Sequence, residues 1–236
     1  MNTIVPQIDL DKEIDFTDKI FWLYLDYEEP PISLNLKHFN ILLSLNEIHF
    51  QLKESYRIWK DLGMSFESKK DFSVILNKIE GNKRKNFPSI YSTFLIKRVI
   101  EEFISLYYYF SFYRKYKKFP KIIKIDSIGR LLNNKKNKNL IKELELQKIK
   151  EKNKKFLYKL NDISNAHKHS FINTEVNNVI GHDEPIIYAL RLENNNLDLF
   201  SGQKNFYGIA VNEILKDFNK FIKDSYEFLK KFEEKN

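Results

Sequence analysis

The sequence predicts an all-α protein, an up-and-down helical bundle with a small β-hairpin before the C-terminal helix. Several long segments place apolar residues three and four positions apart, which is the spacing of one helix face. Only six Gly and six Pro occur in 236 residues, too few for the tight turns of an all-β protein. Hydrophobic residues make up 42% of the chain, which is enough to bury one core.

The N-terminal region is expected to be an acidic arm over residues 1–30, followed by a single domain over residues 31–236. The arm holds eight acidic residues against two Lys and ends at Pro30-Pro31. Trp22 and nearby apolar residues give it aromatic anchors. Two interpretations stay open: the arm lies on a basic surface of its own or a neighbouring chain, or it is a poorly ordered tail with one short helix.

The domain begins with a helix from Ser33, which Gly63 is suited to end. Its apolar stripe comprises Leu34, Ile41, Leu42, Leu45, Ile48, Leu52, Tyr56 and Trp59. His38 and His49 lie eleven positions apart on this helix, so we expect surface histidines and no ligand pair. A shorter helix over 71–80 and a basic loop over 82–88 are expected next.

The central element is a helix that Ser89 can cap and Pro120 ends. Nearly every residue from Phe103 to Tyr113 is apolar or aromatic, as expected for a helix surrounded by others. We interpret this row as core. The alternative is a dimer face, because the row is too apolar to remain in contact with water.

The second half predicts a polar, flexible connection over 133–139 and helical structure from Leu140, broken or continuous, into a helix over 154–170. Two apolar stretches, 186–192 and 197–200, predict a β-hairpin over about 186–200. A lone hairpin is unstable, so it must lie against the bundle. An amphipathic C-terminal helix is expected from Val211 to Phe232.

The net charge of +8 is unevenly distributed. Residues 113–160 hold 17 Lys or Arg against four acidic residues, a local excess of 13. Such an excess is typical of a surface that binds RNA or another polyanion. The candidate nucleic-acid-binding residues are Lys117, Lys118, Lys121, Lys124, Lys154 and Lys155. The alternative is a solvated Lys-rich face without a ligand.

Several function classes find no support. The chain has no Cys, which excludes disulfides and thiolate metal or redox sites. Its glycines are isolated, so neither a phosphate-binding loop nor a dinucleotide fingerprint is present. No apolar run approaches the roughly 20 residues of a membrane span, and the N-terminus lacks a basic-then-apolar signal. We expect a cytoplasmic protein that needs no cofactor, metal or membrane.

The helix predicted over 154–170 combines an apolar stripe with groups able to do chemistry. At about 100° of rotation per residue, one side carries Phe156, Leu160, Ile163 and His167. The opposite side carries Asp162, Asn165 and His169. The two histidines therefore diverge and do not form a metal-binding pair, and we interpret His167 as a core histidine.

The run Ser164-Asn165-Ala166-His167-Lys168-His169 resembles the signature helix of the HEPN superfamily. In that signature an Arg-Asn pair is followed by a His four residues after the Asn. Asn165 and His169 occupy the Asn and His positions, and Ser164 stands where the family has Arg. The resemblance implies a small helical domain, usually a homodimer. Active members are metal-independent endoribonucleases whose Arg and His form a composite two-chain site.

The resemblance assigns roles to four candidate catalytic residues. His169 would move protons during cleavage through the 2′-hydroxyl, since histidine titrates near ~6.5, and Asn165 would orient it or contact the phosphate. Ser164 cannot supply the missing cation, but Lys168 lies four residues later on the same side and is a substitute. A toxin or phage-defence setting would follow.

Other interpretations of the same residues stay open. Asn165 and His169 can form a polar seam at a helix end or dimer interface. The chain can equally be a non-catalytic HEPN-like module that binds nucleic acid, a nucleotide or a protein partner, or a purely structural helical protein.

Overall fold

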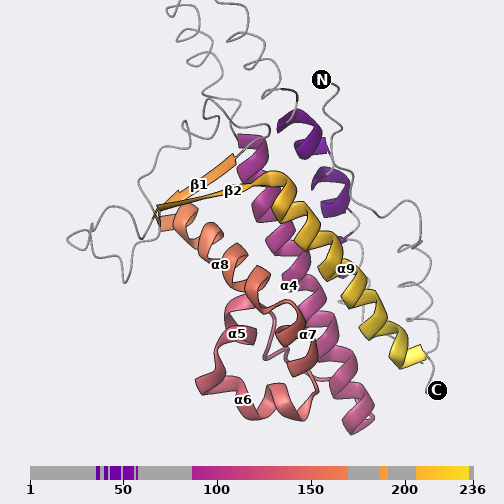
Figure 1. The fold of residues 1–236 in the computed structure, drawn as a ribbon. Coiled ribbons are helices and arrows are strands. Elements are labelled where there is room, and N and C mark those ends of the chain that lie inside the picture. Colours follow the sequence, from indigo (N-terminus) through magenta and orange to yellow (C-terminus); the bar gives the residue numbers. More distant parts are fainter. Residues whose placement is uncertain are drawn as a thin grey trace, which may run out of the picture. The chain divides into compact units, whose positions relative to one another are not determined.

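The computed structural model describes residues 36–37, 40–41, 43–48, 50–55, 57, 87–169, 186–190 and 206–233. These residues form helices and one two-stranded antiparallel sheet that precedes the C-terminal helix (Figure 1). The predicted all-α class with a small hairpin is therefore confirmed. The acidic arm over 1–30, the helix over 71–80, most of the basic loop over 82–88, and Gly63 lie outside the described residues.

The chain divides into two compact units, each built from three segments. One, the hairpin unit, comprises Met1–Gln7, Glu47–Leu95 and Asp162–Leu215. The other, the aromatic unit, comprises Ile8–Asn46, Ile96–Asn161 and Lys216–Asn236. This division does not follow the predicted boundary at residue 30, and a single domain over 31–236 stays a prediction.

The aromatic unit is organised around α4 (Phe87–Tyr116) and α9 (Val211–Glu233), both of which were predicted. Within this unit the two helices lie side by side (Figure 1). The rings of Phe103 and Phe221 meet edge to face with centroids 6.2 Å apart, and both side chains are fully buried. The wide apolar face of α4 is therefore buried against neighbouring side chains. The apolar row that begins at Phe103 belongs to the core, as predicted.

Four shorter helices complete the unit and lead out of it: α5 (Ile128–Leu132), α6 (Asn134–Glu143), α7 (Gln147–Lys152) and α8 (Lys154–His169). The predicted flexible connection over 133–139 is wrong, because α6 begins at Asn134. Ile141 and Leu144 are buried and anchor this Lys- and Asn-rich helix. The Asn137 side chain also donates a hydrogen bond to the carbonyl of Arg130, 2.8 Å away. The helical stretch after Leu140 is broken, with Glu145 at a positive φ of 56°.

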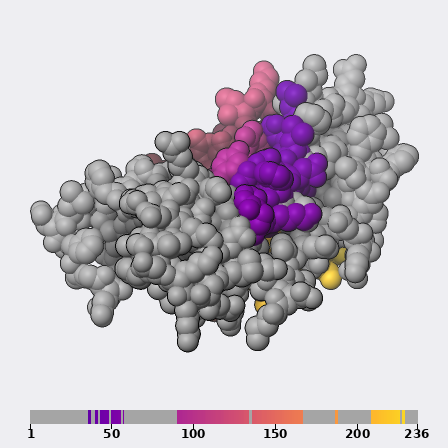
Figure 2. Space-filling model, turned by 90° about the horizontal axis from the view of Figure 1, so that it is seen from above, coloured from indigo at the N-terminus to yellow at the C-terminus, as the bar shows by residue number. Residues whose placement is uncertain are grey.

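The described residues between 36 and 57 are helical, as the apolar stripe predicts. The side chains of Ile41, Leu45, Ile48 and Leu52 are all buried. Figure 2 shows the described residues of this segment in indigo. His38 and His49 fall outside the described residues, so their predicted surface position stays a prediction.

The hairpin pairs β1 (Ile186–Leu190) with β2 (Phe206–Ala210) in antiparallel register. The second strand was predicted at 197–200, which is wrong: Ile186 pairs with Ala210 and Leu190 with Phe206. Buried Ile187 lies opposite buried Ile209, and this apolar cross-strand pair explains the register. Residues 197–200 themselves lie outside the described part of the chain.

Candidate nucleic-acid interface and signature helix

The segment after α4, here called the strap (residues 117–127), folds back along that helix. Lys117 leaves α4 in the left-handed region, with φ at 54°. The Phe119 ring then packs on Tyr113 and Tyr109, with centroids 4.5 and 5.1 Å away. Tyr113 and Tyr109 lie one and two turns before the end of α4, so these contacts hold the strap against the last part of the helix.

Hydrogen bonds and buried apolar side chains fix the second half of the strap. The backbone of Lys124 hydrogen-bonds to the Tyr108 hydroxyl, whose pKa is raised by burial. Just beyond the strap, the backbone N–H of Ile128 donates to Glu101 Oε1 at 3.3 Å. Pro120 and Ile125 are buried and serve as apolar anchors.

Lysines occupy the positions between these anchors. Lys117, Lys118, Lys121 and Lys124 are all exposed, and within the described residues none of them has an ion-pair partner. The strap, which aromatic contacts fix against α4, therefore displays four cations that no described residue neutralises. This arrangement suits a polyanion, because each lysine can pair with a phosphate without first breaking an ion pair to another described residue.

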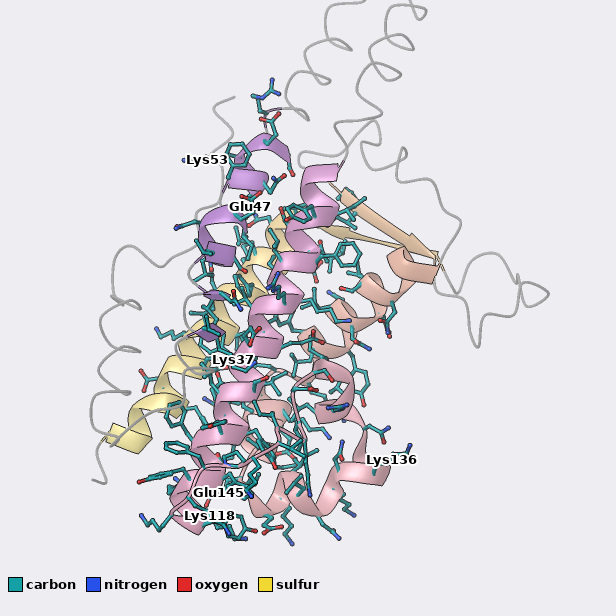
Figure 3. All side chains as sticks on the ribbon, turned by 180° about the vertical axis from the view of Figure 1, so that it is seen from behind. Lys37, Glu47, Lys53, Lys118, Lys136 and Glu145 are labelled. Atoms are coloured by element: carbon teal, nitrogen blue, oxygen red, sulfur yellow. The ribbon has the colours of Figure 1, made fainter. Side chains whose placement is uncertain are left out.

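The neighbouring cations of α4 differ, because acidic residues of α6 and the following turn neutralise them. Arg114 Nη2 lies 3.0 Å from Glu145 Oε2, and Lys115 Nζ lies 2.9 Å from Glu143 Oε1. Figure 3 shows Lys118 and Glu145 at the same end of α4. Arg114 and Lys115 are therefore paired with acidic residues, whereas the strap lysines have no ion pair with any described residue.

Tyr116 joins this acidic corner. Its hydroxyl donates a hydrogen bond to the Glu143 carboxylate. That bond, and then Lys115, lower the pKa of Glu143, while the same bond raises the pKa of Tyr116. The contact with Glu143 likewise raises the pKa of Lys115. At neutral pH, Glu143 is therefore ionised and accepts from protonated Tyr116 and charged Lys115.

The two remaining candidates for nucleic-acid binding, Lys154 and Lys155, lie on a different element, the first turn of α8. Both are exposed and have no ion pair with another described residue. Lys150 is buried close by, and burial and then the charge of Lys154 lower its pKa. The structure thus collects the four strap lysines on one segment and places these two on another.

Helix α8 has the two faces that its sequence predicts. Phe156, Leu160 and Ile163 are buried, whereas Asn165 is exposed. The helix continues through His169, so the backbone positions of Asn165 and His169 are one turn apart. The side chains of His167, Lys168 and His169 lie outside the described residues, and their predicted roles stay predictions.

Ser164 is fully buried. Its hydroxyl has no hydrogen-bond partner among the described residues. It lies four residues after Leu160 and seven after Leu157, both buried, so it falls within the apolar stripe. Of the signature residues whose side chains are described, Asn165 therefore meets solvent and Ser164 does not.

Sequence reasoning missed a buried cation on α4. Lys97 is 8% exposed, and its Nζ lies 3.2 Å from Oδ1 of Asn161 on α8, within the aromatic unit. The signal was a pair of basic residues, Lys97 and Arg98, within an otherwise apolar run from Leu95 to Ile100. This bond ties α4 to the polar side of α8.

Within the described part of the chain, no group of three or more His, Asp or Glu side chains is placed to hold a metal ion. No described helix combines the length and the apolarity that crossing a bilayer requires. No family model, curated protein or solved structure matches the chain.

Proposed function

We propose that this chain is a HEPN-like RNA-binding protein that contacts the phosphates of RNA through its strap. The supporting observation is the set of exposed lysines, Lys117, Lys118, Lys121 and Lys124, which have no ion pair with any described residue. Lys154 and Lys155 extend the binding surface in this proposal. Phosphate contacts of this kind supply sequence-independent affinity, so the RNA sequence is left open.

A second candidate function is metal-independent endoribonuclease activity at α8. Exposed Asn165 on a helix that continues through His169 favours it, because the signature requires these residues one turn apart. His169 would act as the acid–base group and Asn165 would orient it. Lys168 would supply the cation, since Ser164 carries no charge.

The binding experiment compares two variants of equal net charge. One changes the four strap lysines to Gln, and its control changes four other exposed lysines to Gln: Lys136, Lys138, Lys216 and Lys223. We expect the strap variant to bind labelled RNA at least about tenfold more weakly, with the control near wild type. Equal loss in both variants would show that only total charge matters and would refute the strap as the site.

The cleavage experiment incubates labelled RNA with the protein in EDTA, beside His169→Ala and Asn165→Ala. Cleavage that persists in EDTA and is lost in His169→Ala supports the endoribonuclease. Binding without cleavage supports the alternative, a non-catalytic HEPN-like module for nucleic acid, a nucleotide or a protein partner. A protein that neither binds nor cleaves RNA contradicts both proposed functions.

The proposal includes a homodimer, a cytoplasmic location and a toxin or phage-defence setting. A composite site needs two copies, because the resemblance places its groups on both chains. Light scattering tests this directly: a dimer mass at micromolar concentration agrees with the proposal, whereas a monomer argues against a composite site.

A further inference from the structure

We infer that the strap surface selects single-stranded RNA by stacking a nucleobase on Tyr116. The inference rests on the proposed RNA binding and adds the class of RNA to it. Lysines alone do not distinguish a single strand from a duplex, since both carry phosphates. An exposed aromatic ring beside them does, because only unpaired bases offer a free face.

Tyr116 exposes part of its aromatic ring next to the strap. It is the last residue of α4, directly before Lys117 and Lys118, and it is 40% exposed. Phe112 packs against it with ring centroids 4.5 Å apart, and Glu143 accepts a hydrogen bond from its hydroxyl. The ring is therefore held at two points while a large part of it meets solvent. A ring fixed before the ligand arrives costs little conformational entropy on binding.

The Lys115 side chain shows that a cation can lie over the face of this ring. Its Nζ lies over Tyr116, 5.4 Å from the ring centroid. The Lys115 side chain is itself 43% exposed, so a base can replace it over the ring. The Lys115 ammonium keeps its ion pair with Glu143, and the strap lysines supply the phosphate contacts.

The strap adds an apolar contact among its lysines. Ile122 is 72% exposed and lies between Lys121 and Lys124 in the chain. An exposed apolar side chain with lysines before and after it in the chain suits the face of an unstacked base next to its own phosphates. An anionic membrane surface would use the same two features, and the experiment below separates the two ligands.

The test measures binding by fluorescence anisotropy with a single-stranded RNA and a duplex RNA of equal phosphate count. We expect the single strand to bind more tightly. Tyr116→Ala should weaken single-strand binding about tenfold or more while leaving duplex binding nearly unchanged. The matched control is Tyr91→Ala near the start of α4, because Tyr91 is exposed to a similar extent, 44%. This control should bind like wild type.

Two further variants keep the test meaningful if Tyr116→Ala folds poorly. Tyr116→Phe keeps the ring and loses the bond to Glu143, so it should retain single-strand preference. Tyr116→Leu keeps apolar bulk without a π-face and should lose that preference.

The outcomes separate this inference from the proposed function. If the strap lysine variant loses RNA binding but Tyr116→Ala does not, or if the duplex binds as tightly as the single strand, stacking is refuted and the RNA-binding proposal stands. If neither RNA binds, the proposed function fails first. Binding to vesicles of anionic lipid that Ile122→Ser abolishes, with RNA binding unaffected by Tyr116→Leu, would also overturn the inference.

Discussion

The hydroxyl of Tyr116 donates a hydrogen bond to the carboxylate of Glu143, which joins the last turn of α4 to the last turn of α6. Lys115 adds an ion pair to the same carboxylate. One acidic residue thus fixes the ring beside the strap and neutralises the neighbouring lysine. Both contacts lie at the end of α4, directly before the strap begins at Lys117.

Glu143→Gln should remove a pH-dependent part of the stability. The pKa of Glu143 is lowered, chiefly by the Tyr116 hydrogen bond, so its contribution is present above the ordinary Glu pKa of about 4.3 and is lost as pH falls through the lowered pKa. The pKa values of Tyr116 and Lys115 are raised, so their contribution is lost as pH rises through those values. Urea unfolding at a series of pH values measures this.

The control for this series is Glu227→Gln, an exposed carboxylate on α9 without an ion pair among the described residues. Glu143→Gln should be less stable than wild type at pH 7, and the two should converge in acid. A difference that stays constant from pH 7 to acid would contradict the assignment to this carboxylate.

Phe103 and Phe221 should show energetic coupling beyond their separate burial. Both rings are fully buried and meet edge to face. Phe→Ala at either position should lower the free energy of unfolding by about 3–5 kcal/mol. A double-mutant cycle should give a coupling of about 0.5–1.5 kcal/mol. Tyr158→Ala, at an exposed position, should change stability by no more than about 0.5 kcal/mol.

Strict additivity of the two Phe→Ala effects would contradict a direct ring contact. If either Ala variant fails to fold, the Phe→Leu cycle measures the same coupling with a smaller cavity.

Helical periodicity was enough to predict the helical elements that have a clear apolar stripe. The stripe through Ile41, Leu45 and Ile48 is buried, and so is the row of α4 from Phe103. The helix that begins at Asn134 was not predicted, because residues 133–139 are all polar and carry no apolar stripe of their own. Lysine is compatible with a helix. Ile141 and Leu144, just beyond the polar run, are buried and fix the helix in place. The hairpin error arose because 197–200 and 206–210 both suit a strand, and only pairing decides between them.

The candidate site was predictable to a lesser degree. Charge counting located the strap lysines, since a cluster of cations is visible in the chain itself. The ion pairs of Arg114 and Lys115 were not predictable, because their partners Glu143 and Glu145 lie about thirty residues away. The anchoring of the strap by Phe119 was missed for the same reason, since it depends on a chain reversal at Lys117.

Ser164→Ala should leave stability unchanged or raise it by up to about 1 kcal/mol. The Ser164 hydroxyl is fully buried and has no hydrogen-bond partner among the described residues, so its removal relieves a desolvation cost. The matched control is Ser225→Ala, another fully buried serine, whose hydroxyl donates to the Phe221 carbonyl at 2.6 Å. Ser225→Ala should cost about 1 kcal/mol. Thermal unfolding of the two variants measures the contrast.

Equal destabilisation of both serine variants would mean that Ser164 has a stabilising partner in the folded chain. RNA binding by Ser164→Ala should match wild type, because a buried hydroxyl does not contact a ligand.

The strap lysines should set the salt dependence of RNA affinity. Each phosphate contact contributes about 0.7 to the slope of log K against log salt for a single strand. Changing Lys117, Lys118, Lys121 and Lys124 to Gln should therefore reduce the slope by up to about 3, whereas Tyr116→Ala should weaken binding with the slope unchanged, because stacking releases no counterions. Titrations from about 50 to 300 mM salt measure both. The control quartet of Lys136, Lys138, Lys216 and Lys223 should keep the wild-type slope, and an equal decrease in that quartet would show that the phosphates do not lie on the strap.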